Sequence, residues 1–291
     1  MILAGVSFWL NILPGNYLNM IILCIGNACT HVSGAEVTLR ASDGKLSHPA
    51  VFVAGGSFGL ILGKLLATSS VPPYAILLFT LTAIPFALMG EKYKHIDVEA
   101  CVLCEKFNFA NPKLSKKAVI IMSTIIVIVR GYMGYGIPTT WKKTVLQGVI
   151  LYFTMGIGKA MGGFLADAFG VKKIGIISAV AALPFLLIGD NYMMVSLLGV
   201  MLFSMTMSIT LALLVSVLKD RPGYAFGFTT IGLFLGSVPI FFYRPANQTV
   251  NILTLVGLTV LCLIFMLIVI KKDVKTDACE YADIADFNGD N

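Results

Sequence analysis

The chain has 291 residues, of which 57% are hydrophobic and only 12% are charged. A soluble domain carries about 25% charged residues, so this composition, with a mean hydropathy of +0.89, excludes a water-soluble globule and indicates a protein of the lipid bilayer. The net charge of +6 is explained by the placement of basic residues in loops, and we expect no nucleic acid among the partners.

About ten apolar segments follow one another along the chain, and most are long enough to cross a bilayer as helices. They cover residues 1–13, 17–39, 49–67, 72–90, 118–137, 144–166, 171–189, 192–218, 222–243 and 248–271. Short turns with Pro, Gly or charged residues separate most of them and leave no room for a soluble domain. The sequence therefore predicts an all-α fold, a polytopic bundle of transmembrane helices.

Only residues 91–117 form a long hydrophilic stretch, with six lysines and four acidic residues. This linker divides the chain into two unequal halves. The expected domains are an N-terminal bundle over 1–90, the linker over 91–117, a bundle of about six helices over 118–271 and a tail over 272–291. Cys101-x-x-Cys104 in the linker has no second pair of ligands, so we favour reduced surface cysteines over a metal site.

The placement of basic residues predicts the orientation of the helices, because each span reverses the side on which the next loop lies. One set of loops, with the C-terminal tail, holds 15 of the 21 Lys and Arg residues, and the opposite set holds Lys142, Lys143 and Arg244. Basic loops are retained in the cytoplasm. We therefore expect a multi-pass protein of the cell membrane whose central linker and C-terminus are cytoplasmic.

The sequence repeats itself at an offset of about 175 residues. Pro49 lies ten residues before Gly59-Leu-Ile-Leu-Gly63. Pro222 lies ten residues before the similar stretch Gly232-Leu-Phe-Leu-Gly236. These matches predict a unit of three helices that is used repeatedly, which is the architecture of secondary transporters. By the same offset, the first half lacks counterparts of two helices that the second half contains.

Glycines recur at four-residue steps in both copies of the repeat. They are Gly55, Gly59 and Gly63 in the first copy, and Gly232 and Gly236 in the second. Small residues at this spacing let two membrane helices approach closely. We expect all five to be helix-packing positions.

The turn Gly163-Phe-Leu-Ala-Asp167-Ala-Phe-Gly170-Val-Lys172-Lys173 lies between two expected spans. It resembles the G-x-L-A-D-x-x-G-x-[RK]-[RK] loop of the major facilitator superfamily. The glycines permit a tight turn and a close approach of helices. Asp167 can face a helix N-terminus, and Lys172 with Lys173 can meet anionic headgroups. The resemblance implies that this loop gates conformational change.

The resemblance further implies a secondary transporter with two six-helix halves. The apolar segments would then be helices 3 to 12 of that family, and the bundle over 1–90 would be incomplete. In this interpretation the chain is shortened at its N-terminus and lacks helices 1, 2 and part of 3.

Three basic residues lie inside apolar segments, where an ionised side chain costs about 2.5–3.5 kcal/mol. Arg130 and Lys159 both fall in the middle third of their spans, and no span offers a deep carboxylate. This pattern suggests an anion as the counter-charge. The alternatives are that Arg130 bonds carbonyl groups near Gly131 and Gly134, and that Lys159 snorkels to the inner surface.

Lys64 and His31 complete the expected substrate pathway. Lys64 lies near the outer end of its segment, so we favour a side chain that snorkels outward. His31 has an ordinary pKa near 6.5 and could relay protons for coupling, although a hydrogen-bonded structural histidine is favoured.

The leading functional hypothesis is a secondary active transporter that moves a small solute, with an anion as one candidate, by alternating access and with proton coupling. The competing hypothesis is a truncated remnant or scaffold that does not transport. A membrane enzyme has little support, since the sequence holds no H-E-x-x-H pair and no nucleotide-binding loop. We expect no catalytic residues, no cofactor and no metal; the expected partners are the solute and the lipid bilayer.

Overall fold

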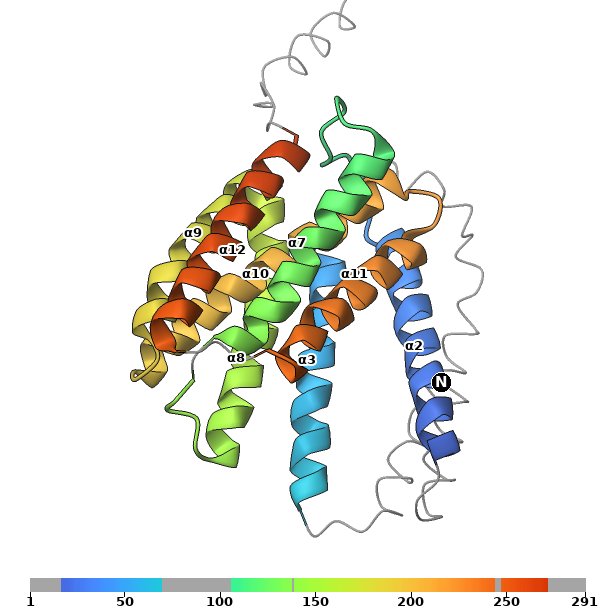
Figure 1. The fold of residues 1–291 in the computed structure, drawn as a ribbon. Helices are drawn as coiled ribbons and strands as arrows, with labels where there is room; N and C mark the ends of the chain where they lie inside the picture. Colours follow the sequence, from blue (N-terminus) through green and yellow to red (C-terminus); the bar gives the residue numbers. More distant parts are fainter. Residues whose placement is uncertain (1–16, 70–105, 138, 244–246, 272–291) are drawn as a thin grey trace, which may run out of the picture.

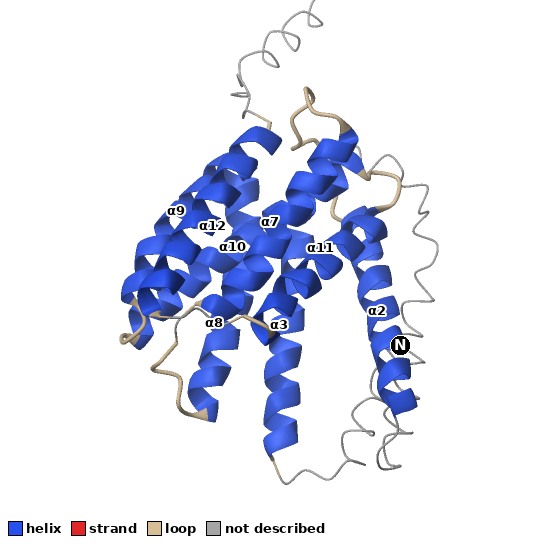
Figure 2. Ribbon diagram, viewed as in Figure 1, coloured by secondary structure: helices blue, strands red, loops and turns tan. Residues whose placement is uncertain are grey.

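The computed structural model describes residues 17–69, 106–137, 139–243 and 247–271, and every regular element in these ranges is a helix (Figure 2). The helices are α2 (Tyr17–Arg40), α3 (Ser47–Thr68), α7 (Lys116–Gly136), α8 (Val145–Phe169), α9 (Val171–Ile188), α10 (Met193–Val217), α11 (Pro222–Ser237), the short 3₁₀ helix η1 (Val238–Phe241) and α12 (Gln248–Val269).

Eight helices in the described ranges are long and apolar enough to cross a membrane. This confirms the all-α, multi-pass part of the prediction. The expected segments at 1–13 and 72–90, the Cys101–Cys104 pair and the tail over 272–291 lie outside the described residues. The expected total of about ten helices therefore stays a prediction.

Most helices begin where the sequence supplies a partner for the free backbone N–H groups of the first turn. The Ser115 side chain accepts a hydrogen bond from the Ala118 backbone at the start of α7, and Asn247 caps α12 in the same way. Thr144 and Gln147 form a reciprocal capping box on α8. Pro222 opens α11, where its missing N–H costs nothing.

Helix α10 forms the centre of the second bundle. It is the most buried of the membrane-spanning helices, and it contacts α7, α8, α9 and α11 (Figure 1). Its side chains Ile209, Leu213 and Leu214 are completely buried. Because lipid does not drive apolar side chains together, this tight packing supplies much of the attraction that holds the bundle together.

The glycines of the second copy pack as expected. A Cβ on Gly232 would lie 2.9 Å from the Val127 side chain, and a Cβ on Gly236 would lie 2.9 Å from the Cα of Gly131. Gly131 in turn would meet the Leu233 carbonyl oxygen at 2.9 Å. The α7 and α11 backbones therefore touch at a point that admits no side chain.

The glycines of the first copy do not behave in this way. A Cβ on Gly55, Gly59 or Gly63 would meet nothing within 4 Å among the described residues. The expectation that these three positions pack against another helix is therefore not met in the described part of the chain. Instead they face open space, which is described below.

The loops that are rich in basic residues gather at one end of the bundle, the basic end. Arg40, the last residue of α2, donates to the Asp220 carbonyl before α11 at 3.2 Å. The linker reaches the same end, where the Asn111 N–H donates to the Val269 carbonyl at 2.7 Å. At the opposite end, the Thr140 hydroxyl donates to the Asp190 carbonyl at 2.6 Å. This arrangement agrees with the loop sorting on which the predicted orientation depends.

We predict that Gly236→Leu destabilises the bundle by about 1–3 kcal/mol, because the new side chain must push α7 and α11 apart. Thermal unfolding of the purified chain in detergent measures the change. Gly257→Leu on α12 is the matched control, since a Cβ there meets nothing within 4 Å. Equal melting temperatures for the two variants would contradict the close contact.

Candidate solute-binding site

A cavity of about 1150 Å³ lies between helices that belong to both halves of the sequence. Its walls come from α2, α3, α8, α10 and α11. A typical small-molecule pocket has roughly 300–1,000 Å³. The space is therefore large enough to hold a metabolite rather than a few water molecules.

Three basic side chains from the sequence prediction line this cavity, namely His31 on α2, Lys64 on α3 and Lys159 on α8. No Asp or Glu is among the described residues that line it. Three predicted pathway residues from three helices thus share one space. The remaining lining is mostly apolar, with hydroxyl groups from Tyr152 and Thr229.

Lys159 is held by a residue that sequence analysis missed. Its Nζ donates a hydrogen bond of 2.8 Å to the hydroxyl of Ser57, which is 2% exposed. The contact crosses from α8 to α3, so Lys159 neither points at lipid nor reaches the inner surface. The sequence signal for this contact was a polar residue between the glycines of α3.

Ser57 also stands in Gly55-Gly56-Ser57-Phe58-Gly59, which matches the G-x-S-x-G pattern of many serine hydrolases. That pattern works on a sharp strand-to-helix turn that exposes the nucleophile next to free N–H groups. Ser57 instead lies buried inside regular helix α3, whose backbone N–H groups are used in the helix. The geometry favours a side chain that positions Lys159 over a nucleophile.

The glycines of α3 form one wall of the cavity. Gly55, Gly59 and Gly63 all line it, and no described residue comes within 4 Å of a Cβ at any of the three. Without side chains, this wall leaves the helix backbone accessible to a ligand. The four-residue glycine step thus gives the cavity a wall without side chains.

Aromatic rings narrow the cavity towards the basic end. The His31 ring stacks on Phe226 with centroids 6.3 Å apart, and Phe52 meets both rings edge-on. These side chains come from α2, α11 and α3. His31 therefore lies at the cavity wall with one face covered, which is compatible with either of the two roles expected for it.

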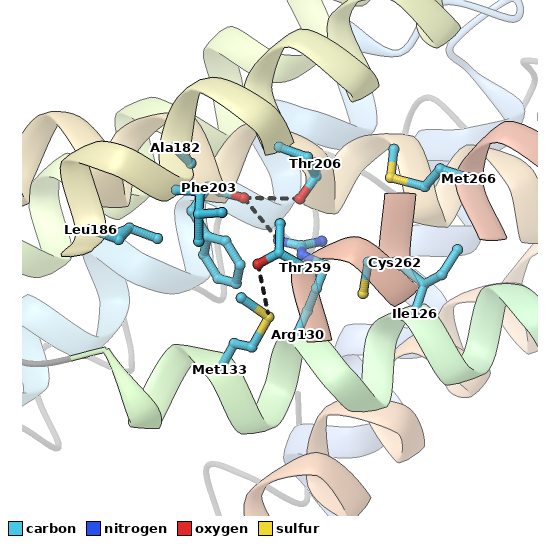
Figure 3. A pocket seen from close by; sticks show the side chains of 12 residues that line it. Ile126, Arg130, Met133, Ala182, Leu186, Phe203, Thr206, Thr259, Cys262 and Met266 are labelled. Atoms are coloured by element: carbon cyan, nitrogen blue, oxygen red, sulfur yellow. Dashed lines mark hydrogen bonds between the residues drawn. The ribbon is translucent and has the colours of Figure 1, made fainter. Parts of the chain in front are cut away.

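Arg130 is not among the residues that line this cavity, and Figure 3 shows the pocket that it lines instead. It lines a separate space of about 20 Å³ between α7, α9, α10 and α12, which has room for about one water molecule. Its guanidinium donates to the Phe203 carbonyl at 3.3 Å and lies 5.2 Å from the centroid of the Phe203 ring. The Nε atom is buried and has no hydrogen-bond partner among the described residues.

The structure therefore separates the two deep cations that the sequence had placed together. Arg130 projects into the interior of the second bundle, while Lys159 projects between the halves. The alternative in which Arg130 bonds a carbonyl group is closer to the observed geometry, although the acceptor is on α10 and not near Gly131 or Gly134.

The predicted gate loop joins the two halves at the basic end. The Asp167 carboxylate accepts hydrogen bonds from the backbone N–H groups of Leu46 and Ser47, at 2.7 and 2.9 Å. These groups are at the N-terminus of α3, where a negative charge is stabilised by the helix dipole. Asp167 thus faces a helix N-terminus, as expected, and the helix belongs to the other half.

The neighbouring residues of the loop explain its composition. A Cβ on Gly163 would lie 2.6 Å from the Leu46 carbonyl oxygen, so α8 and α3 touch there. Gly170 turns the chain with φ of 94°, a conformation that favours glycine. Lys173 lies over the Phe169 ring and is exposed, and Lys172 is partly exposed, so both can reach a headgroup region.

A second carboxylate makes an equivalent contact that sequence analysis did not assign. Glu36 near the end of α2 accepts a hydrogen bond of 2.6 Å from the Gly223 N–H at the start of α11. Its other oxygen accepts two hydrogen bonds from Arg40, at 2.8 and 2.7 Å. The sequence signal was an acidic residue one turn before Arg40 at a helix end.

Four hydrogen bonds join α2 or α3 to the second half at the basic end, and the bond between Lys159 and Ser57 lies near mid-depth. The linker adds Lys106, whose hydrogen bond to Asp43 holds the pKa of that carboxyl below its ordinary value. This surface contact weakens only as the pH falls through the lowered pKa. The halves are thus tied together at the basic end.

The described part of the chain contains no group of three or more His, Cys, Asp or Glu that could hold a metal ion. The chain matches no protein-family model, no curated protein and no solved structure. The features that bear on its function are therefore the geometry of the cavity and the contacts of the loop around Asp167.

We predict that Asp167→Ala destabilises the chain by about 1–2 kcal/mol, because two N–H groups of α3 lose their acceptor and a favourable charge. Thermal unfolding in detergent measures the loss. Lys172→Ala in the same loop is the control and should unfold near the wild-type temperature. If both variants behave alike, the capping contact contributes nothing.

We predict that Arg130→Met leaves stability unchanged or raises it by up to about 4 kcal/mol, because a poorly paired buried charge is replaced by an apolar chain of similar length. Arg130→Lys should be less stable than Arg130→Met, since it keeps the charge and loses the planar stacking on Phe203. Melting temperatures of the three proteins test this order. A large loss in Arg130→Met alone would show that the guanidinium has a partner.

Proposed function

We propose that the chain is a secondary transporter of the major facilitator type, which moves a small solute through the cell membrane by alternating access. The observation that carries the proposal is the cavity between the halves, where Lys159, Lys64 and His31 face one space. Secondary transporters hold their solute at such an interface near mid-membrane. The match of the loop around Asp167 to the motif of that family supports the same proposal.

The arrangement of contacts supports an outward-facing state. Carboxylates of Asp167 and Glu36 tie the halves together at the basic end, which is the cytoplasmic end according to the positive-inside rule. In the proposed cycle these contacts break when the cavity opens inwards. A carboxylate on a helix N-terminus suits a reversible contact, because water can replace its hydrogen bonds once the end opens.

Proton coupling is part of the proposal, with His31 as the group that binds the proton. His31 lines the cavity, and histidine is the side chain type that most readily binds and releases a proton near neutral pH. The alternative function is a membrane scaffold that does not transport. The Asp167 and Glu36 contacts would then be permanent structural features.

The direct test is uptake of labelled mono- and dicarboxylates into proteoliposomes that contain the purified full chain. We expect flux above empty vesicles, and a loss of about tenfold or more in Lys159→Gln, because a hydrogen bond to a charged group contributes about 1.5–3 kcal/mol. Lys143→Gln on the exposed loop outside the cavity is the control and should transport normally. Absence of flux for every solute would favour the scaffold.

For the coupling step, His31→Asn should abolish uptake driven by a pH gradient and retain exchange of solute across the membrane. Measurement of both modes in the same vesicles separates them. If the variant keeps gradient-driven uptake, the proton is carried elsewhere.

A further inference from the structure

The two lysines of the cavity lie at different depths along the wall that α3 forms. Lys159 reaches from α8 to Ser57 on α3, and Lys64 reaches from α3 towards α8, where its Nζ lies 3.2 Å from the position of a Cβ on Gly148. Ser57 and Lys64 are two turns apart on one face of α3, about 10 Å along its axis. The two ammonium groups therefore stand at the two ends of a short stretch of α3.

The stretch of α3 between these two charges offers no polar side chain to a ligand. Gly59 and Gly63 face open space, and Leu60 lines the same stretch. No backbone group there is free, because α3 is regular over these residues. A ligand that lies against this wall meets a cation, then an apolar surface, then a second cation.

The electrostatic balance of the cavity selects among ligand classes. Its described lining holds two ammonium groups and no carboxylate, so a cationic solute would be repelled. A neutral solute would leave the Lys159 ammonium without a counter-ion near mid-depth of the membrane, which is costly, and would gain nothing from the charge of Lys64. A monoanion would neutralise one lysine only.

We propose that the cavity binds an elongated organic dianion, with one anionic group at Lys159, the second at Lys64 and an apolar middle against the glycine wall of α3. This inference deepens the proposed transport function, on which its physiological meaning rests. The dianion matches both charges and the apolar surface between them, and its length is chosen from the spacing of about 10 Å between Ser57 and Lys64 along α3. Ser57 acts as a positioning residue that holds Lys159 at its end of the site.

Binding of radiolabelled azelate, a linear dicarboxylate of matching length, to the full chain in lipid nanodiscs tests the inference. Nonanoate serves as the monoanion of equal length, and empty nanodiscs correct for partition into lipid. We expect azelate to bind about tenfold or more tightly than nonanoate, since its second carboxylate gains a charge-assisted contact. Equal affinity for the two ligands would overturn the proposal.

Single variants assign the two ends of the site. Lys64→Gln should lower azelate affinity to that of nonanoate and leave nonanoate binding unchanged. Lys159→Gln should weaken the binding of both ligands, because nonanoate is expected to place its carboxylate at Lys159. Should Lys64→Gln bind azelate like the wild type, Lys64 only snorkels and the two-point site does not exist.

The glycine wall allows a test that does not remove a charge. Gly59→Leu should fold normally, because the new side chain enters open space, and should reduce azelate binding by about tenfold or more by filling the middle of the site. Gly257→Leu, in open space on α12, is the matched control. Unchanged azelate binding in Gly59→Leu would exclude the wall as part of the site.

The outcomes separate this inference from the transport proposal. Tight azelate binding without flux in proteoliposomes would support the dianion site and reject transport. Flux of monocarboxylates with no preference for azelate would support transport and reject the dianion site.

Discussion

The need to pair every charge in a medium without water governs this molecule. At the basic end the chain meets that need with its own groups, since Asp167 and Glu36 accept hydrogen bonds from N–H groups at the starts of α3 and α11. In the packed interior the need is met only in part, because the Arg130 Nε has no partner among the described residues. Where the chain has no carboxylate, the basic groups of Lys159 and Lys64 face a cavity. The same constraint thus accounts both for the ties between the halves and for the character of the space that they enclose.

Both ties lie at one end, which has a mechanical consequence. In the proposed transport cycle, the two halves exchange one closed end for the other by rotating as bodies. Close contacts resist such movement within the second bundle, as at Gly131 and Gly236, and also between the halves, where α3 and α8 touch at Gly163. The contact between α3 and α8 differs from those within the second bundle, because it combines close packing at Gly163 with the hydrogen bond from Lys159 to Ser57.

Glycine has two opposite uses in this fold, although the sequence pattern is nearly the same in both. In α11, Gly232 and Gly236 let the α7 backbone approach, and they stabilise the bundle by close packing. In α3, Gly59 and Gly63 face the cavity and leave space. The repeat therefore predicts where glycines occur but not whether they are covered, because that depends on which helix lies opposite.

The sequence alone determined the solvent of this protein, the membrane-spanning segments in the described ranges and the sorting of basic loops, because hydropathy and loop charge are local properties. The contact of Asp167 with a helix N-terminus was also foreseen, since its turn carries a short motif. Only the tertiary structure decided that Arg130 and Lys159 lie in different cavities. It also decided that Ser57 accepts a hydrogen bond from Lys159 and that Glu36 accepts one at the start of α11. Depth along a helix follows from counting residues, whereas the direction of a side chain depends on how each helix is rotated against its neighbours.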